Sequence, residues 1–146
     1  MSQGSDIEIA RRAKLKPITD VAATIVSAAH PGVVDTVLVD GRRINSCLAL
    51  AVSLDGAEIT TIEGLADGAQ LHPVQAAFIN HDGFQCGFCT PGMMITARAL
   101  LDRNPEPTED EIREAISGQI CRCTGYTTIV RSIQWAAAHA NEEVQA

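Results

Sequence analysis

Two closely spaced pairs of cysteines constrain this chain more than any other feature of its sequence. The first pair has the spacing C-x2-C, the second has C-x-C, and 31 residues separate them. Helical sequence between the pairs lets them converge on one point, where four thiolates can hold a metal centre. The cysteines concerned are Cys86, Cys89, Cys121 and Cys123. We therefore expect the rest of the chain to position that centre.

Composition and charge narrow the class of protein. The chain has 146 residues, 46% of them apolar, so it can bury a core as one ordinary domain or two small ones. Its net charge of −7 is not the excess of positive charge that favours binding to nucleic acid or to an anionic membrane. No apolar run is long enough to insert into a membrane, and the start lacks a secretory pattern. We expect a cytoplasmic protein, in which cysteines favour metal binding over disulfides.

The first part of the chain predicts a small sheet with one helix. Residues 1–20 are polar and read as a leader, and residues 21–29 can form a short helix. Residues 36–39 are a β-rich run, the turn signal after them predicts a hairpin with residues 44–50, and residues 59–62 predict another strand. The expected organisation is a leader over 1–20, a sheet domain over 21–68 and a helical domain over 69–146.

The second part of the chain predicts four helices. The first is expected over residues 73–80, and the second starts at Thr90, which we expect to cap it, with Pro91 at its first position. Residues 108–111 form a capping box for the third helix, and the fourth starts near Thr127. Each cysteine pair therefore falls at a junction between helices, where helix N-termini help to stabilise thiolates.

The spacing of the cysteines is compared with three kinds of metal or redox site. A structural zinc site usually takes two C-x2–4-C knuckles, for which a C-x-C pair is unusual. A thioredoxin-like redox pair would use only Cys86 and Cys89, and the chain gives it no βαβ context. A [2Fe–2S] cluster takes four thiolates, two for each iron, and both pairs would be used. The spacing therefore favours the iron–sulfur centre and leaves zinc open as the second candidate.

The residues around the cysteines carry a resemblance to a known family. The motifs are residues 85–93 and 120–126, with 31 residues between the cysteine pairs. Together they resemble those of the small iron–sulfur subunit of molybdenum hydroxylases. This is the family of xanthine oxidase and aerobic carbon monoxide dehydrogenase. The resemblance covers about residues 36–140. It implies an α+β chain in which a plant-ferredoxin-like β-grasp domain, truncated or degenerate here, precedes a four-helix [2Fe–2S] domain.

The resemblance also implies site residues, partners and a role. Cys86, Cys89, Cys121 and Cys123 would be the cluster ligands. Gln85 would hydrogen-bond the molybdopterin of a large partner subunit, and Cys123 would lie on the electron path toward it. The chain would pass electrons on toward flavin (FAD), carried in this family by a medium subunit, as an oxidoreductase subunit without catalytic side chains of its own. The rival functions are a zinc-stapled or non-redox scaffold module and a stand-alone ferredoxin.

The chain departs from the family at its first cluster. The family uses a C-x4-C-x2-C loop before the strand at residues 36–39, plus a later cysteine to which Cys47 corresponds, but residues 29–35 hold no cysteine. His30 and Asp35 with one cysteine do not reproduce the two histidines and two cysteines of a Rieske centre. We therefore expect one cluster, with Cys47 as a remnant of the first site or a small apolar residue. A degenerate first domain and an altered reading frame before residue 36 both explain the difference.

Overall fold

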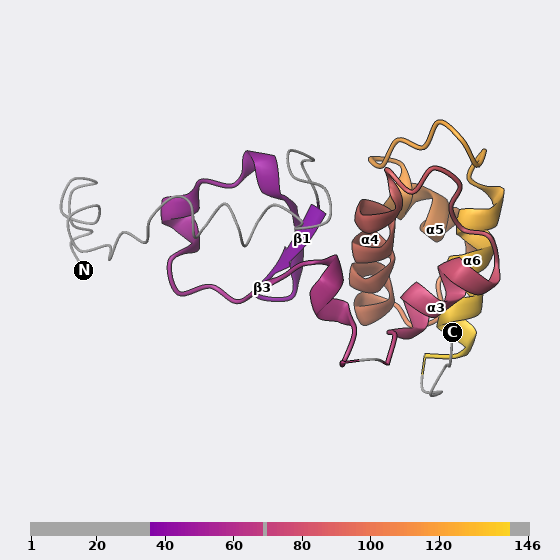
Figure 1. Cartoon of the computed structure of the whole chain (residues 1–146), viewed down its shortest axis with the longest axis horizontal. Helices are drawn as coiled ribbons and strands as arrows, with labels where there is room; N and C mark the ends of the chain where they lie inside the picture. Colours follow the sequence, from indigo (N-terminus) through magenta and orange to yellow (C-terminus); the bar gives the residue numbers. More distant parts are fainter. Residues whose placement is uncertain (1–35, 69, 141–146) are drawn as a thin grey trace.

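The fold joins a small sheet to a group of α-helices. The computed structural model describes residues 36–68 and 70–140, which we call the sheet region and the helical region. The predicted leader over 1–20, the predicted helix over 21–29, and His30 and Asp35 lie outside the described residues. Helix α4 (Thr90–Arg103) lies between the sheet and the other helices (Figure 1). No helix of the described part is long and apolar enough to cross a membrane.

The sheet has three short antiparallel strands. Strand β1 (Thr36–Val39) is central, β2 (Arg42–Asn45) pairs with it on one side and β3 (Ile59–Thr60) on the other. The β1–β2 turn uses Asp40 at φ 48° and Gly41 at φ 74°. Two successive residues with positive φ are typical of the tight hairpin turn whose twist matches its strands, and an Asp-Gly pair adopts it readily. The predicted hairpin is confirmed.

The predicted return strand over residues 44–50 is wrong beyond Asn45. Strand β2 ends at Asn45, and two 3₁₀ helices follow, η1 (Ser46–Leu48) and η2 (Ala51–Leu54). The strand stops because the next residues turn into η1, where the Ala49 N–H donates to the Ser46 carbonyl at 3.2 Å. Similarly, β3 covers only half of the strand predicted over 59–62, because η3 (Ile62–Leu65) takes over.

The four predicted helices are present in the helical region. They are α3 (Pro73–Asn80), α4, α5 (Glu109–Ile116) and α6 (Thr127–Ala138). The capping box of α5 is confirmed, since Glu111 N–H donates to Thr108 Oγ1 at 3.3 Å and Thr108 N–H donates to Glu111 Oε2 at 2.8 Å. The predicted cap of α4 is wrong. Cys89 occupies the N-cap position without a side-chain cap bond, and Thr90 is already helical.

The helical region is built around one apolar core. Helix α4 contributes buried side chains to two sides, because the sheet covers one side of it and the other helices cover the opposite side. Leu38 of β1 packs with Ile95 and Ala99 of α4, and this contact joins the two regions. The larger cluster consists of Val74, Ala77, Phe78, Met93, Met94, Ala97, Leu100, Ile112, Ile116, Ile129, Val130, Ile133 and Ala136.

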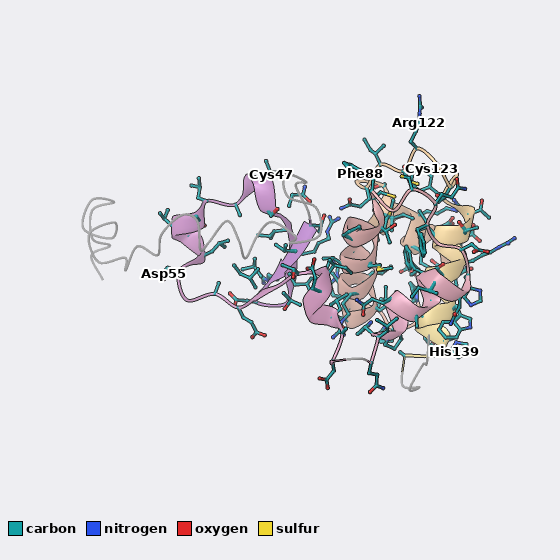
Figure 2. All side chains as sticks on the ribbon, in the orientation of Figure 1. Cys47, Asp55, Phe88, Arg122, Cys123 and His139 are labelled. Atoms are coloured by element: carbon teal, nitrogen blue, oxygen red, sulfur yellow. The ribbon has the colours of Figure 1, made fainter. Side chains whose placement is uncertain are left out.

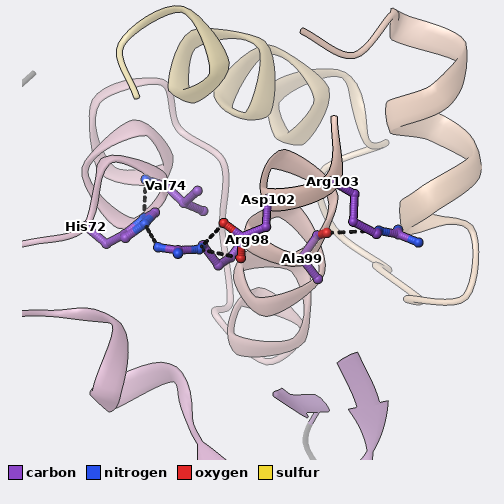
Figure 3. Close-up of polar contacts among 6 residues, drawn as sticks. All are labelled: His72, Val74, Arg98, Ala99, Asp102 and Arg103. Carbon is purple, nitrogen blue, oxygen red and sulfur yellow. Dashed lines mark hydrogen bonds and ion pairs between the residues drawn. The ribbon is translucent and has the colours of Figure 1, made fainter. Parts of the chain in front are cut away.

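The start of α3 carries a partly exposed polar network (Figure 3). His72 Nδ1 accepts from the Val74 N–H at 3.2 Å, so His72 caps the helix. The Arg98 guanidinium of α4 lies against the Nε2 edge of the same ring and forms an ion pair of 2.8 Å with Asp102. Burial and the Arg98 cation lower the pKa of His72 below its usual 6.5, although Asp102 opposes them. The ring therefore remains neutral, and able to cap, to a lower pH than an ordinary histidine.

Candidate metal centre

The structure brings all four predicted cysteines together at one end of the helical region. Cys86 and Cys89 lie between α3 and α4, and Cys121 and Cys123 lie between α5 and α6. The Sγ atoms of Cys86 and Cys123 are 3.4 Å apart, and the thiols of Cys89 and Cys121 are hydrogen-bonded to each other. Each close pair therefore takes one cysteine from each motif. All are free thiols.

The two pairs differ in burial. Cys86 and Cys123 are exposed, while Cys89 and Cys121 are half-buried and pack against the helical core. In the described part of the chain no three His, Cys, Asp or Glu side chains are grouped to hold a single metal ion. Two adjoining pairs of thiols fit the donor set of a two-iron cluster, in which each iron takes two protein thiolates.

In the exposed pair, the Cys123 thiol donates a hydrogen bond to the Cys86 sulfur. A hydrogen bond from the Phe88 N–H, followed by one from the Cys123 thiol, lowers the pKa of Cys86. The same Cys123–Cys86 hydrogen bond raises the pKa of Cys123, because it stabilises the protonated form of the donor. Cys86 is therefore the member of this pair that ionises first and offers a thiolate to a metal.

In the half-buried pair, too, the pKa of one thiol is lowered and that of the other is raised. Burial would raise the pKa of Cys121, but hydrogen bonds from the Thr124 hydroxyl and N–H outweigh it and lower that pKa to about 7. Burial, together with the hydrogen bond to Cys121, raises the pKa of Cys89 to about 12. In each pair, therefore, one thiol has a lowered pKa and the other a raised pKa.

The segment from Cys121 to Tyr126 folds back on itself around the Cys121 sulfur. Gly125 at φ 65° and Tyr126 at φ 69° both adopt the left-handed conformation. The reversal lets the Tyr126 hydroxyl accept from the Cys121 N–H at 2.9 Å and donate to the Gln119 carbonyl at 3.1 Å. Left-handed backbone is unfavourable for a tyrosine, so these two hydrogen bonds and its packing on the core help to hold it there.

Gln119 links this segment to the sheet region. Its Nε2 donates to Thr36 Oγ1 on β1 at 2.7 Å and lies 3.4 Å from Thr96 Oγ1 on α4. Gly92 on α4 makes room for it, since a Cβ there would come within 2.7 Å of Gln119 Oε1. One amide side chain therefore ties β1, α4 and the cysteine loop together.

The other two predicted site residues lie differently. Gln85 is exposed beside Cys86, as a contact with a partner's cofactor would require. Cys47 is exposed on the sheet region and lies apart from Cys123 (Figure 2). It does not join the four-cysteine group.

Sequence reasoning missed the supporting roles of three residues, Gln119, Thr124 and Tyr126. Thr124 and Tyr126 act through a backbone reversal and Gln119 through its contact with β1, and cysteine spacing reveals neither. The available signal was the Gly-Tyr pair after C-x-C, because glycine often marks a left-handed turn.

Comparison with known proteins gives the class to which this site belongs. Residues 61–134, about half of the chain, match the family described as the [2Fe-2S] binding domain. The chain belongs to this [2Fe–2S]-binding family, and the [2Fe–2S] cluster is the cofactor that the family binds.

Individual relatives show which proteins of this family the chain is similar to. The chain is 53% identical to the aldehyde oxidoreductase iron-sulfur-binding subunit PaoA of Escherichia coli K12, over 70% of this chain and 51% of that protein. It is 53% identical to the nicotine 6-hydroxylase small subunit of Paenarthrobacter nicotinovorans, over 67% of this chain and 59% of that protein. The chain thus spans only about half of these relatives. They confirm the resemblance to the iron–sulfur subunits of molybdenum hydroxylases.

Solved structures support the same fold. Quinoline 2-oxidoreductase from Pseudomonas putida 86 superposes with a TM-score of 0.69 and 49% identity, over 75% of this chain and 69% of that chain. Aldehyde oxidoreductase from Desulfovibrio gigas superposes with a TM-score of 0.69 and 41% identity, over 73% of this chain and 12% of that chain. The mixed fold of a small sheet and helices is therefore that of molybdenum hydroxylase iron–sulfur domains.

Proposed function

We propose that this chain is the electron-transfer iron–sulfur subunit of a molybdopterin-dependent hydroxylase or dehydrogenase. The observation that carries the proposal is the meeting of four thiols from two motifs as two adjoining pairs. Cys86 and Cys123 supply two ligands of one [2Fe–2S] cluster, and Cys89 and Cys121 supply the other two. When bound, such a cluster accepts and releases electrons one at a time.

The chain's own residues would control the cluster through hydrogen bonds and burial. Backbone N–H groups of Phe88 and Thr124 are directed at the sulfurs of Cys86 and Cys121. Such donors and the surrounding apolar shell are the usual means by which a protein tunes a cluster. No side chain of this chain acts as a general acid or base in the proposed function.

The partner is a large molybdopterin-binding subunit that covers the exposed cysteine pair. Gln85 and Cys123 would approach its cofactor. Phe88 and Ile120 flank the cysteines and are 67% and 83% exposed, so a partner surface would remove apolar area from water there. The names of two relatives include "iron-sulfur-binding subunit" and "small subunit", which supports a multi-subunit enzyme. A medium FAD-binding subunit would receive the electrons.

The sheet region belongs, in this proposal, to a degenerate β-grasp domain over 21–68, with a helical cluster domain over 69–146. Cys47 is the one cysteine outside the four-cysteine group, so the chain holds a single cluster. Intact-mass measurement with resequencing of the region before residue 36 separates genuine degeneration from an altered reading frame.

Metal analysis of the aerobically purified chain tests the proposal. We expect the visible absorption of an iron–sulfur protein, with about two irons and two acid-labile sulfides per chain. A colourless protein with one zinc would refute the electron-transfer role and support the scaffold alternative. Four irons would refute the single cluster. Co-purification with a molybdopterin-containing subunit is expected, and its failure on co-expression would favour a stand-alone ferredoxin.

A further inference from the structure

Thr124 presents two hydrogen-bonding groups to one cysteine sulfur. Its Oγ1 lies 3.1 Å from Cys121 Sγ, and its backbone N–H lies 3.5 Å from the same atom. The N–H contact comes from the backbone, so any side chain at this position could keep it. The hydroxyl contact depends on the identity of the residue.

The direction of the hydroxyl bond follows from its neighbours. The Tyr126 N–H donates to Thr124 Oγ1 at 3.1 Å, so a lone pair of that oxygen is already occupied. A sulfur bound to iron carries no proton and can only accept. The hydroxyl hydrogen is therefore free to point at Cys121 Sγ, and Thr124 is the donor once Cys121 is a ligand.

The geometry holds this donor in place. The left-handed residues Gly125 and Tyr126 reverse the chain, and the Tyr126 hydroxyl bridges the Cys121 N–H and the Gln119 carbonyl. Thr124 and Tyr126 therefore fix the two ends of the same short turn. A donor held by the fold is already oriented before the charge on the sulfur changes.

We propose that the Thr124 hydroxyl raises the reduction potential of the cluster by donating to the Cys121 sulfur. The inference rests on the proposed function, since it requires Cys121 to be a ligand. One-electron reduction adds negative charge to the cluster and its thiolates, and a hydrogen-bond donor stabilises the more negative state more strongly. Thr124 is thus a positioning residue that acts through Cys121.

Thr124→Val tests the proposal, because valine keeps the branched shape and the backbone N–H but removes the hydroxyl. Thr124→Ser keeps the hydroxyl, and Thr128→Val is the matched control. The Thr128 Oγ1 is buried without a hydrogen-bond partner, so its loss removes no hydrogen bond. For each full-length variant we would measure iron and sulfide content, the visible spectrum and the midpoint potential in a redox titration.

We expect all variants to hold the same iron, with the midpoint potential of Thr124→Val more negative than that of wild type and those of Thr124→Ser and Thr128→Val unchanged. An unchanged potential in fully loaded Thr124→Val, or a Thr124→Ser variant that behaves like it, would overturn the inference. If Thr124→Val holds no iron, Thr124→Ala replaces it, and loss of iron in both would overturn it in favour of a purely structural role. Absence of iron in the wild type would instead refute the proposed function.

Discussion

The helical region buries more of its large apolar side chains than the sheet region does. The helices gather theirs into one core in which Phe78, Met93 and Ile133 are completely buried. In the sheet region Leu48, Leu50 and Val52 are 79%, 71% and 62% exposed. Apolar packing between this region and the helices involves Leu38 on β1 and Ile62 and Leu65 on η3.

This difference shows which region can position the cysteines. A close-packed core holds helix ends in fixed places, so loops between those helices also have fixed ends. The four thiols lie on such loops, whereas Cys47 lies on the sheet region. Stability and the metal centre therefore belong to the same part of the described chain. Four predictions test how far the regions differ, in order of decreasing effect.

The largest contrast is expected between Cys121→Ser and Cys47→Ser. The first removes a proposed ligand, so bound iron should fall to near zero and the helical region should lose stability, because metal binding is coupled to folding. The second should leave iron content unchanged. Iron analysis and circular dichroism during thermal unfolding measure both. Equal loss of iron in the two variants would show that the sheet region also holds a metal.

Core truncation should separate the regions next. Phe78→Ala removes a completely buried ring from the helical core and should lower the free energy of unfolding by about 3–5 kcal/mol. Leu50→Ala, in the sheet region, removes a side chain that is 71% exposed and should change it by less than about 0.5 kcal/mol. Denaturant titration of the two variants gives the comparison. A large effect of Leu50→Ala would mean that this side chain is covered in solution.

Helix capping should give a smaller contrast. Thr108→Ala removes the side-chain cap of α5 and should cost about 1 kcal/mol of unfolding free energy. Thr61→Ala is the control in the sheet region, since Thr61 precedes η3 without a side-chain cap bond. Its effect should be clearly smaller in the same denaturant titration. A reversed order would contradict the assignment of the capping box.

The smallest effect is expected from pH at His72, where the chain enters the helical region. Its pKa is lower in the folded state than the usual 6.5, so the unfolded chain takes up a proton first as pH falls. The contribution of His72 to stability is therefore complete above about pH 6.5 and is lost as pH falls toward its folded pKa. His72→Asn keeps a cap that does not titrate. Unfolding free energies between pH 7.5 and 5 should fall more for wild type than for His72→Asn, and parallel curves would refute the assignment.

Much of the helical region could be predicted from the sequence because its signals are local. The start of α3 at Pro73, the capping box at Thr108 and the start of α6 at Thr127 each depend on residues within one turn. The start of α4 was found, but its cap was not. A threonine beside a proline has the composition of a cap, whereas the structure places Cys89 at that position.

The sheet region and the details of the site were harder to predict, because they depend on distant contacts. Strand β2 ends at Asn45 where η1 begins, although the residues up to Leu50 have a composition that also suits a strand. The cysteine spacing indicated that four thiols meet, but not that each close pair combines the two motifs. That pairing is decided by how α3, α4, α5 and α6 pack together.

The Gln119 bridge gives the sheet region a part in the behaviour of the cysteine loop. Ordering a glutamine side chain costs about 1.5–2 kcal/mol of conformational entropy, and the chain bears this cost when β1 and α4 hold the Gln119 side chain. A loop restrained in advance loses less freedom when its sulfurs bind iron. In the proposed function, a strand outside the four-cysteine group would in this way favour binding of the cluster by a neighbouring loop.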